Sequence, residues 1–316
     1  MKTVKAVAPY IHPEELNFKK APYEAWVKLG GQTAKSHYPH RLLHGLAFRY
    51  EIPTILKNSK EARLRFVEPV SLSFDTFPDY ACYEIIPFVW DCWPRYFEKM
   101  CHWMKKHQVR TAIFTSSQTA ERMRQRFPET NIMYCPEAVD SSCYKQGKFL
   151  KERRIDLLEF GRGSGIDFNE NQNGNKKFQY VCTKVNGKFT YTNKQLYEAM
   201  GDAKVTIALP RSITQPEVAG DIETLTQRYW ECMLSRMVMV GQAPKELTEL
   251  IGYNPVIEID KEHFTEQILN ILTYIDDYQK LVDKNHEVAL HFGDWFVRMR
   301  EVMGWLQSKD YISFSL

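Results

Sequence analysis

The stretch GDIETLTQRYWECMLSRMVMVGQAPKELTELIGYNPVIEID, residues 220–260, decides the fold class. Within it, TLTQRYWECMLSR predicts a helix, and MVMVG and NPVIEID predict short apolar strands. The segment KVTIALP, residues 204–210, predicts one more strand just upstream. Strand, helix and strand in this order require parallel strands that are joined by crossover helices. The stretch therefore predicts an α/β domain with a parallel sheet.

The rest of the chain shows the same alternation in two series. The first series has the predicted strands TVKAVAPY, ACYEIIPFVW, RTAIFTSS and NIMYCPE, and the second opens with IDLLEFG and FQYVCTKV. Between the two series, the polar and charged segment 140–154 has the composition of a linker. A length of 316 residues suits two domains. We therefore expect one α/β domain over residues 1–150 and a second over residues 151–292.

Composition indicates a soluble globular protein, with 44% apolar and 26% charged residues. The N-terminus lacks the apolar run of a signal peptide, and no uninterrupted apolar run is long enough to cross a membrane, so we expect a cytoplasmic protein. Seven cysteines without a C-x-x-C pair suggest neither a disulfide framework nor a zinc site. Residues 1–150 carry 22 basic and 15 acidic side chains, a net charge of +7, whereas the remainder carries −4. This asymmetry favours an anionic partner for the first domain, although a solvated basic surface explains it too.

A helix-start signal lies inside the opening stretch. Thr224 followed three residues later by Gln227 predicts a capping box, with Thr224 as the N-cap. Leu225, Thr226 and Gln227 would then be the first helical residues, whose amides have no acceptor within the helix. Because this helix follows a strand, its start is expected at the carboxyl edge of a parallel sheet. Free amides and the helix dipole favour a phosphate there.

Two glutamates lie on either side of this helix start, Glu223 before it and Glu231 inside it. A carboxylate accepts two hydrogen bonds from neighbouring sugar hydroxyls, so the pair suits a sugar or a ribose. The alternative is structural: Glu231 pairs with Arg228 one turn back, and Glu223 is an exposed loop acid. The spacing alone leaves both interpretations open.

The segment ETLTQRYWE resembles the Glu-x7-Glu signature of retaining GT-B glycosyltransferases of family 4, which include sucrose and glycogen synthases. Its surroundings are similar as well: LYEAMGDAKVTIALPRS lies upstream, ECMLSRMVMVGQAPKEL lies downstream, and LEFGRGS follows the first strand of the second domain. The resemblance covers residues 155–260 well and the first domain only loosely. It implies two Rossmann-like domains facing a cleft, with a C-terminal helix, residues 293–316, that returns to the first domain.

The resemblance also implies roles for residues of the second domain. Glu231 would bind the ribose hydroxyls of a nucleotide, and Glu223 would face the hydroxyls of the donor sugar. The amides of Leu225, Thr226 and Gln227 would bind the diphosphate. All five therefore belong to the expected donor site, with Glu223 as a catalytic residue.

Cations for the leaving phosphate are the part of the resemblance that fits least well. Arg162 matches the arginine of the family, although a surface arginine beside a glycine-rich loop explains it equally. The accompanying lysine is missing at its usual place, and the next lysine is Lys176. Arg211 or Arg236 could supply the charge instead, and a solvated surface suits both equally well.

In the first domain, the resemblance points to Gly30, Gly31 and Asp91. A glycine pair before the first helix of this domain is typical of the family, and Gly30 and Gly31 would allow the backbone to approach the donor phosphates. A plain turn is the alternative for both glycines. Asp91 follows a predicted strand, where the family often has a side chain that touches the donor sugar. A helix-capping role before Pro94 is its alternative.

The resemblance implies an enzyme that transfers a hexose from a nucleotide sugar to a glycan or lipid-linked acceptor with retention of configuration. No convincing D-x-D motif occurs, so we expect no metal and no cofactor beyond the nucleotide-sugar co-substrate. Polysaccharide biosynthesis and peripheral membrane contact through the basic first domain are further expectations. Nucleotide-sugar epimerisation, or binding of a nucleotide or glycan without catalysis, stays open as an alternative function of the same fold.

Overall fold

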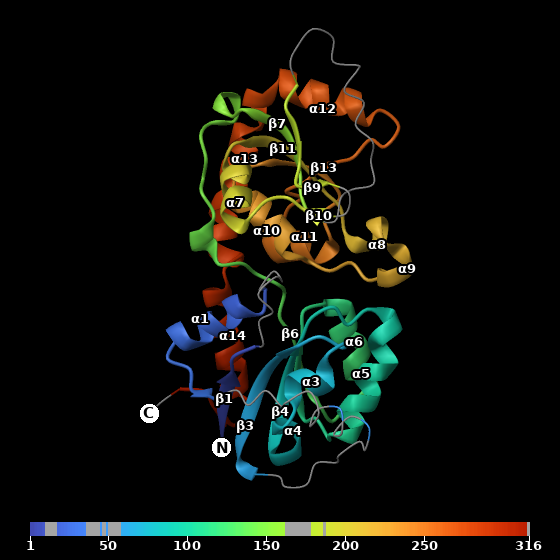
Figure 1. Cartoon of the computed structure of the whole chain (residues 1–316), viewed down its shortest axis with the longest axis vertical. Helices are drawn as coiled ribbons and strands as arrows, with labels where there is room; N and C mark the ends of the chain where they lie inside the picture. Colours follow the sequence, from blue (N-terminus) through green and yellow to red (C-terminus); the bar gives the residue numbers. More distant parts are fainter. Residues whose placement is uncertain are drawn as a thin grey trace. The chain divides into compact units, whose positions relative to one another are not determined.

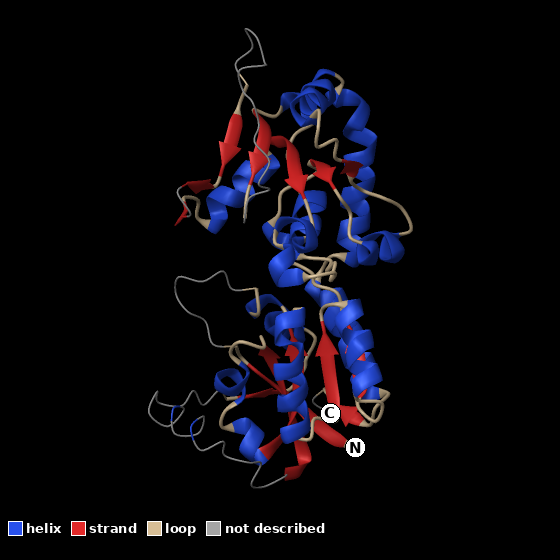
Figure 2. Ribbon diagram, turned by 90° about the vertical axis from the view of Figure 1, so that its right-hand side faces the viewer, coloured by secondary structure: helices blue, strands red, loops and turns tan. Residues whose placement is uncertain are grey.

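The computed structural model describes residues 1–9, 18–35, 45, 49, 58–161, 178–185 and 188–314. The chain forms two compact units, each with its own parallel sheet (Figure 1). Unit 1 comprises Met1–Glu137, Glu217–Thr224 and Trp295–Leu316, and unit 2 comprises Ala138–Pro216 and Leu225–Asp294. Helices lie on both sides of the sheet in each unit (Figure 2). The predicted α/β class with two Rossmann-like domains is therefore confirmed.

The sheet of unit 1 is parallel throughout and has the order β14-β1-β3-β4-β5-β6, with β2 also beside β1. Its strands are β1 (Lys2–Val7), β2 (Thr33–Ala34), β3 (Asn58–Val67), β4 (Tyr83–Val89), β5 (Thr111–Phe114), β6 (Asn131–Tyr134) and β14 (Tyr311–Ile312). Because β2 and β3 lie on opposite sides of β1, the strand order changes direction between β1 and β3. In a parallel sheet, the carboxyl edge beside such a change is where ligands bind.

The described helices of unit 1 range from four to thirteen residues in length. They are α1 (Lys20–Lys28), α3 (Leu72–Thr76), α4 (Asp79–Cys82), α5 (Pro94–Lys106), α6 (Ser117–Arg126) and α14 (Trp295–Gln307). Met100 and Met104 of α5 are buried against the sheet, and so is Met123 of α6. Helix α6 begins at its N-cap Ser116, whose side chain accepts a hydrogen bond from the amide of Thr119.

The C-terminal segment completes unit 1. Helix α14 packs on α1, and Trp295 at its start is 1% exposed, with its ring 6.0 Å from that of Phe88. Strand β14 then pairs with β1, and the Tyr311 hydroxyl lies 2.9 Å from the Thr111 hydroxyl of β5. The expected return of the last helix to the first domain is thus confirmed.

The sheet of unit 2 is also parallel, with the order β13-β12-β11-β7-β8. The strands are β7 (Ile155–Glu159), β8 (Tyr180–Cys182), β11 (Ala203–Ala208), β12 (Val238–Gly241) and β13 (Ile257–Glu258). The hairpin of β9 (Lys184–Val185) and β10 (Lys188–Phe189) lies apart from this sheet. The strand order changes direction between β7 and β11, so a ligand is expected at the carboxyl ends of these two strands.

The longer helices of unit 2 pack around a methionine-rich and aromatic core. They are α7 (Asn193–Gly201), α10 (Gln227–Leu234), α11 (Lys245–Ile251), α12 (Phe264–Thr273) and α13 (Gln279–Phe292), with the short α8 (Arg211–Thr214) after β11. Trp230 and Met233 of α10 are fully buried in this core. Gly241 ends β12 against the backbone of Ala208, where an added Cβ would lie 1.8 Å from the Ala208 carbonyl oxygen. No side chain fits at that position.

Arg153 fixes the opposite, amino edge of this sheet. Its guanidinium is 3% exposed and donates four hydrogen bonds of 2.8–2.9 Å to backbone carbonyls. The acceptors are the carbonyl oxygens of Gln146, Lys148, Ala203 and Ser235. A buried arginine with this many partners is satisfied as a hydrogen-bond donor although it has lost its water.

Two details of the predicted elements are wrong. Helix α10 begins at Gln227 with Thr226 as its N-cap, so the predicted capping box at Thr224 does not form. The glycine pair Gly30 and Gly31 directly follows the helix α1, which the sequence pattern did not predict.

Candidate functional site

The carboxyl edge of the unit 2 sheet brings together the segments after β7 and β11 with the start of α10. Strand β7 continues into Phe160 and Gly161, and β11 continues through Pro210 into Arg211 at the first position of α8. These segments follow the two strands between which the strand order changes direction. The predicted ligand edge therefore carries a glycine, a helix start and an arginine.

Arg228 occupies the space beside Gly161. Gly161 has a φ of +76°, and an added Cβ would lie 2.2 Å from a terminal nitrogen of the Arg228 guanidinium. The same guanidinium lies over the Phe160 ring, 5.2 Å from its centroid. A cation over an aromatic face is attracted by the ring quadrupole. Gly161 and Phe160 together hold the Arg228 charge at the carboxyl end of β7, in the first turn of α10.

Glu231 lies one turn further along α10 and makes a hydrogen bond with Tyr144. The Tyr144 hydroxyl donates to Oε1 of Glu231 at 2.8 Å, and the Tyr144 ring packs on Tyr197 at 4.9 Å. Burial raises the pKa of Glu231, while the hydrogen bond from Tyr144 and the charge of Arg228 oppose that rise. Burial next to Glu231 also raises the pKa of Tyr144, so Tyr144 stays a donor at neutral pH. Glu231 is thus a half-buried acid with one fixed donor, and its other oxygen can accept further hydrogen bonds.

The start of α10 differs from the expected row of open amides. The amide of Leu225 donates to Oε2 of Glu246 at 2.7 Å, and Glu246 is 6% exposed. The expectation that Leu225 offers an open amide is therefore wrong, because a buried carboxylate already accepts from it. Thr226 is the N-cap, and Gln227 is the first helical residue.

The other predicted cations lie at different places. Arg211 is half-buried at the carboxyl edge, and its Nε donates to Gln215 at 3.0 Å. Arg236 lies at the opposite edge, two residues before β12 begins, with its Nε 3.3 Å from the Asp283 carboxylate. Arg162 and Lys176 fall outside the described residues.

Glu223 belongs to unit 1, in the segment Glu217–Thr224. The Gln118 side chain on α6 makes two hydrogen bonds to the backbone of this segment. Its Nε2 donates to the Asp221 carbonyl at 3.0 Å, and its Oε1 accepts from the Glu223 amide at 2.8 Å. Arg122, one turn further along α6, donates to the Asp221 carboxylate at 2.7 Å. The backbone of Glu223 is therefore fixed to α6, while its side chain is half-buried.

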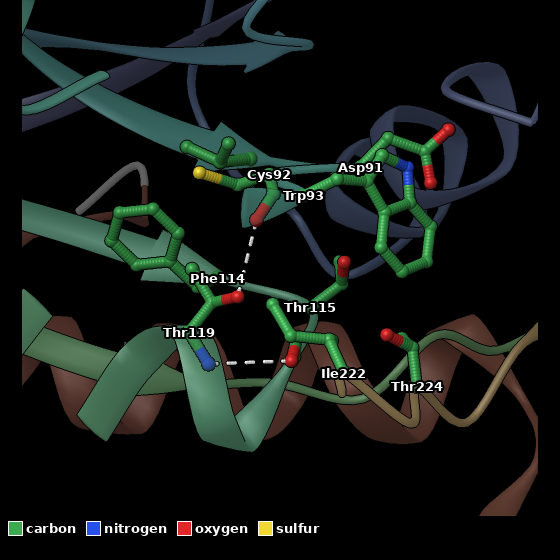
Figure 3. A pocket seen from close by; sticks show the side chains of 10 residues that line it. Asp91, Cys92, Trp93, Phe114, Thr115, Thr119, Ile222 and Thr224 are labelled. Atoms are coloured by element: carbon green, nitrogen blue, oxygen red, sulfur yellow. Dashed lines mark hydrogen bonds between the residues drawn. The ribbon is translucent and has the colours of Figure 1, made fainter. Parts of the chain in front are cut away.

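A hollow of about 240 Å³, part of it open solvent, lies between the carboxyl ends of β4 and β5, the start of α6 and the segment Glu217–Thr224 (Figure 3). Its described lining residues are Val89, Asp91, Cys92, Trp93, Phe114, Thr115, Ser116, Thr119, Ile222 and Thr224. The Thr119 hydroxyl donates to the Cys92 carbonyl at 3.2 Å. Asp91 thus lies in the wall of this hollow, and its contact with a sugar stays a prediction.

Asp91 has an unusual backbone conformation, with a φ of +50°. Aspartate tolerates the left-handed region better than most residues, but the conformation still costs free energy and is often found at functional sites. The N-cap of α5 is Trp93, without a side-chain cap, so Asp91 is not the N-cap of that helix.

The glycine pair of unit 1 has a packing explanation. An added Cβ at Gly31 would lie 2.3 Å from Nε1 of Trp26 and 2.6 Å from Cε of Met303, so the absence of a side chain lets α1 and α14 close on this position. Gly30 has a φ of +81° in the turn after α1. The role of both glycines at a donor phosphate stays a prediction.

Three residues of these sites were missed by the sequence analysis as site residues. Arg228 was considered only as an ion-pair partner of Glu231, whereas it lies against Gly161. Tyr144 lies in the predicted linker, and Gln118 lies on a helix without a recognised motif. The one available signal was the arginine inside the Glu-x7-Glu segment itself.

No protein-family model matches the chain, and no curated protein matches its sequence. Among solved structures, Anabaena HepE, crystallised in complex with UDP and glucose, has a TM-score of 0.58 at 11% identity, with 98% of this chain and 100% of that chain covered. AviGT4, a glycosyltransferase involved in avilamycin A biosynthesis, has a TM-score of 0.52 at 10% identity and 97% coverage of both chains. TarM has a TM-score of 0.53 at 11% identity, with 82% of this chain covered, and this chain spans 56% of the length of TarM. The likeness shows the fold, which matches GT-B glycosyltransferase structures.

Within the described ranges, no helix is long and apolar enough to cross a membrane. The same residues hold no group of three or more histidine, cysteine, aspartate or glutamate side chains suited to a metal ion.

Proposed function

We propose that this chain is a glycosyltransferase that moves a sugar from a nucleotide sugar to a glycan or lipid-linked acceptor. The observation that carries the proposal is the pair of opposite charges on α10 at the ligand edge of unit 2: Arg228 is held against Gly161, and Glu231 is held by Tyr144. A cation beside a helix start suits a diphosphate, and a carboxylate one turn away suits a ribose diol.

In this proposal each group of unit 2 has a distinct role. Glu231 accepts hydrogen bonds from the ribose hydroxyls, and Tyr144 orients its carboxylate. Arg228 and the amide of Gln227 bind the diphosphate, with Thr226 at the same helix start. Arg211 supplies a further cation from the end of β11.

The proposal also includes residues for which the structure gives less support. Arg162, which directly follows Gly161 in the sequence, and Lys176 are kept as candidates for the phosphate. Glu223 is proposed to contact the donor sugar, and Asp91, Gly30 and Gly31 are kept as further candidates; all four belong to unit 1.

Fixed cations and amides aimed at the leaving phosphate stabilise its charge without reorganisation during the reaction. For this reason we propose a metal-independent transfer with no cofactor beyond the donor. Retention of configuration is proposed from the Glu-x7-Glu resemblance, with the leaving phosphate accepting the acceptor proton on the same face of the sugar. The bond from the anomeric carbon to the phosphate oxygen breaks, and the bond to the acceptor oxygen forms.

We further propose that the basic first domain brings the protein to an anionic acceptor or to a membrane surface during polysaccharide biosynthesis. Arg95, Lys99 and Lys105 of α5 are exposed, as such contact requires. Trp103 of the same helix is 6% exposed, so it belongs to the core and not to this surface. Sedimentation with anionic and neutral vesicles at low and high salt tests the contact, because attraction of basic residues to anionic lipid weakens with salt.

The test of the function is a thermal-shift series with UDP, GDP, ADP and the matching nucleosides. A diphosphate at about 100 times its Kd adds about 2.7 kcal/mol to the free energy of unfolding. We expect Arg228→Met to lose most of this gain for the diphosphate and to keep the response to the nucleoside. Arg154→Met is the matched control, because Arg154 is exposed at the amino end of β7.

Donor turnover separates the proposed transferase from the alternatives. Slow release of nucleoside diphosphate from a nucleotide sugar supports a transferase. Interconversion of nucleotide sugars would show an epimerase instead, and tight binding without either reaction would show a binding protein. No thermal response to any of the three diphosphates would overturn the proposed donor site.

A further inference from the structure

The imidazole of His286 connects the two chain segments that carry Tyr144 and Glu231. His286 lies on α13 and is 5% exposed. Its Nδ1 lies 2.8 Å from the carbonyl oxygen of Leu234, the last residue of α10, and its Nε2 lies 2.8 Å from Nε2 of Gln146. Leu234 follows Glu231 by three residues, and Gln146 follows Tyr144 by two. Together with the hydrogen bond from Tyr144 to Glu231, these contacts form a closed loop.

The two partners of the imidazole determine which of its nitrogens carries the hydrogen. A carbonyl oxygen can only accept, so Nδ1 carries the hydrogen and donates to Leu234. In the neutral imidazole Nε2 is then an acceptor, and it accepts from the side-chain amide of Gln146. Both contacts are therefore satisfied by one neutral tautomer of His286.

The surroundings of His286 favour this neutral form. Burial lowers the pKa of His286, and the hydrogen bond to the Leu234 carbonyl opposes that effect. The charge of Arg236 lowers the pKa further, whereas Asp283 and Glu287 on the same helix raise it. The pKa stays below its ordinary value of 6.5, so the imidazole is uncharged at neutral pH.

The segment of residues 144–149 belongs to no helix or strand, so its course depends on contacts of this kind. The Gln146 carbonyl accepts from Nη2 of Arg153 at 2.9 Å. Gly147 has a φ of +70°, and an added Cβ would lie 2.2 Å from the Gly201 carbonyl oxygen. Gln146 is therefore held through both its backbone and its side chain, and it fixes the segment that contains it.

We propose that His286 and Gln146 are positioning residues for Glu231. They hold the segment from which the Tyr144 hydroxyl orients the Glu231 carboxylate. The proposal rests on the proposed function, in which this carboxylate accepts from ribose hydroxyls. His286 binds the end of α10, whereas the diphosphate is proposed to bind at its start. Loss of the contact between Gln146 and His286 should therefore weaken the ribose contact and spare the phosphate contact of Arg228.

Calorimetric titration of the full chain with UDP, GDP, ADP and inorganic pyrophosphate tests this separation. Gln146→Leu should bind the nucleoside diphosphate that the wild type accepts about 2- to 10-fold more weakly, the range for one ordinary hydrogen bond. It should bind pyrophosphate as the wild type does, because pyrophosphate has no ribose. Phe149→Ala is the matched control on the same segment, because its side chain is 59% exposed, and it should bind every ligand as the wild type does.

Gln146→Glu gives a pH profile that a residue with a purely structural role would not give. At alkaline pH the new carboxylate and the neutral Nε2 of His286 are both acceptors, so the contact is lost. The carboxylate also raises the pKa of His286, and a protonated imidazole can donate to it. We expect the nucleotide affinity of this variant, relative to the wild type, to recover as the pH falls from about 8 to about 6.

The NMR signals of the Tyr144 ring, measured without nucleotide, separate failure of this inference from failure of the proposed function. These signals should move in Gln146→Leu and stay in place in Phe149→Ala. Unmoved Tyr144 signals, unchanged nucleotide affinity in Gln146→Leu, an equal loss for nucleotide and pyrophosphate, or no recovery in Gln146→Glu would each overturn the inference. If the wild type binds none of the three nucleotides while the Tyr144 signals move, the donor site is wrong and the positioning contact stands.

Discussion

The Tyr144 hydroxyl lies 2.8 Å from Oε1 of Glu231 and donates a hydrogen bond to it. This contact joins the segment between β6 and β7, which contains Tyr144, to the second turn of α10. It partly offsets the burial that raises the pKa of Glu231. The Glu231 carboxylate can therefore accept hydrogen bonds from a ligand, and its partial burial lowers the free energy of unfolding.

Glu231→Gln should separate stability from binding. The amide oxygen of glutamine still accepts from Tyr144, but the buried charge is gone. We expect an unchanged or higher Tm at pH 7 and at least about tenfold weaker binding of nucleoside diphosphate, because hydrogen bonds to a charged acceptor contribute about 1.5–3 kcal/mol. Calorimetric titration and melting curves on the same samples measure both.

The pH dependence of this variant has a definite sign. The pKa of Glu231 in the folded protein is raised above its ordinary value of 4.5. Above that raised pKa, the folded state carries an unfavourable buried charge that the unfolded state does not. The stability advantage of Glu231→Gln should therefore be present at neutral pH and disappear as the pH falls below about 4.5. An advantage that grows on acidification would contradict the assignment.

Gly161→Ala should displace Arg228. Its Cβ would lie 2.2 Å from a guanidinium nitrogen, and its φ of +76° is unfavourable for alanine. Gly252→Ala is the matched control, because Gly252 has a φ of +79° with no atom within 4 Å of an added Cβ. Both variants should lose about 1 kcal/mol of stability from the backbone, and only Gly161→Ala should also weaken diphosphate binding. Equal diphosphate affinity in the two variants would contradict the role of Arg228.

Gln118→Ala should lower turnover without changing nucleotide affinity. The variant removes both hydrogen bonds that hold the segment from Asp221 to Glu223, while the diphosphate contacts lie in unit 2. Gln125→Ala on the same helix is the control, since Gln125 only donates to the exposed Glu121. Donor hydrolysis rates and UDP titrations are compared for the wild type and the two variants. A loss of UDP affinity in Gln118→Ala would contradict the prediction.

His107 should make unit 1 sensitive to acid. It packs between the rings of Tyr80, at 4.5 Å, and Trp103, at 4.9 Å, and burial lowers its pKa to about 4. Between about 6.5 and about 4 the unfolded chain binds a proton that the folded chain does not, so the free energy of unfolding should fall as the pH falls through this window. His107→Phe should flatten this dependence, and the exposed His102→Gln should leave it as steep as before. Urea unfolding at several pH values measures the slope.

Strands buried on both faces were the predictable part of the fold. Strand β12 is a continuous apolar run, β11 is apolar except for Lys204 and Thr206, and both were predicted from the sequence. Strand β3 was missed because Arg63 and Arg65 interrupt its apolar pattern. In the structure, Arg65 pairs with Asp79 at 3.0 Å, and Arg63 lies over the Tyr83 ring at 3.7 Å. The two arginines fit in this strand because Asp79 and Tyr83, which lie outside it, stabilise their charges. The composition of the strand itself does not reveal these partners.

Residues of the candidate site could be predicted only where they lie close together in the sequence. Glu231 was selected from its spacing to Glu223 within one segment, and it lies on α10. The sequence could not exclude the Leu225 amide as a phosphate ligand, because its acceptor Glu246 lies on another helix. Tyr144 and Gln118 reach their partners across 87 and 105 residues, so no local pattern points to them.

Arg153 has a consequence for the order in which unit 2 folds. Its four carbonyl acceptors extend along the chain from Gln146 to Ser235, and they come together only when β11 and the end of α10 are in place. Before these elements are in place, burial of the guanidinium would remove water without supplying all four carbonyl acceptors. Its burial is therefore favourable only late in folding. We therefore expect Arg153→Met to accelerate unfolding strongly and to leave the rate of refolding nearly unchanged, which makes this arginine a determinant of the lifetime of the folded state.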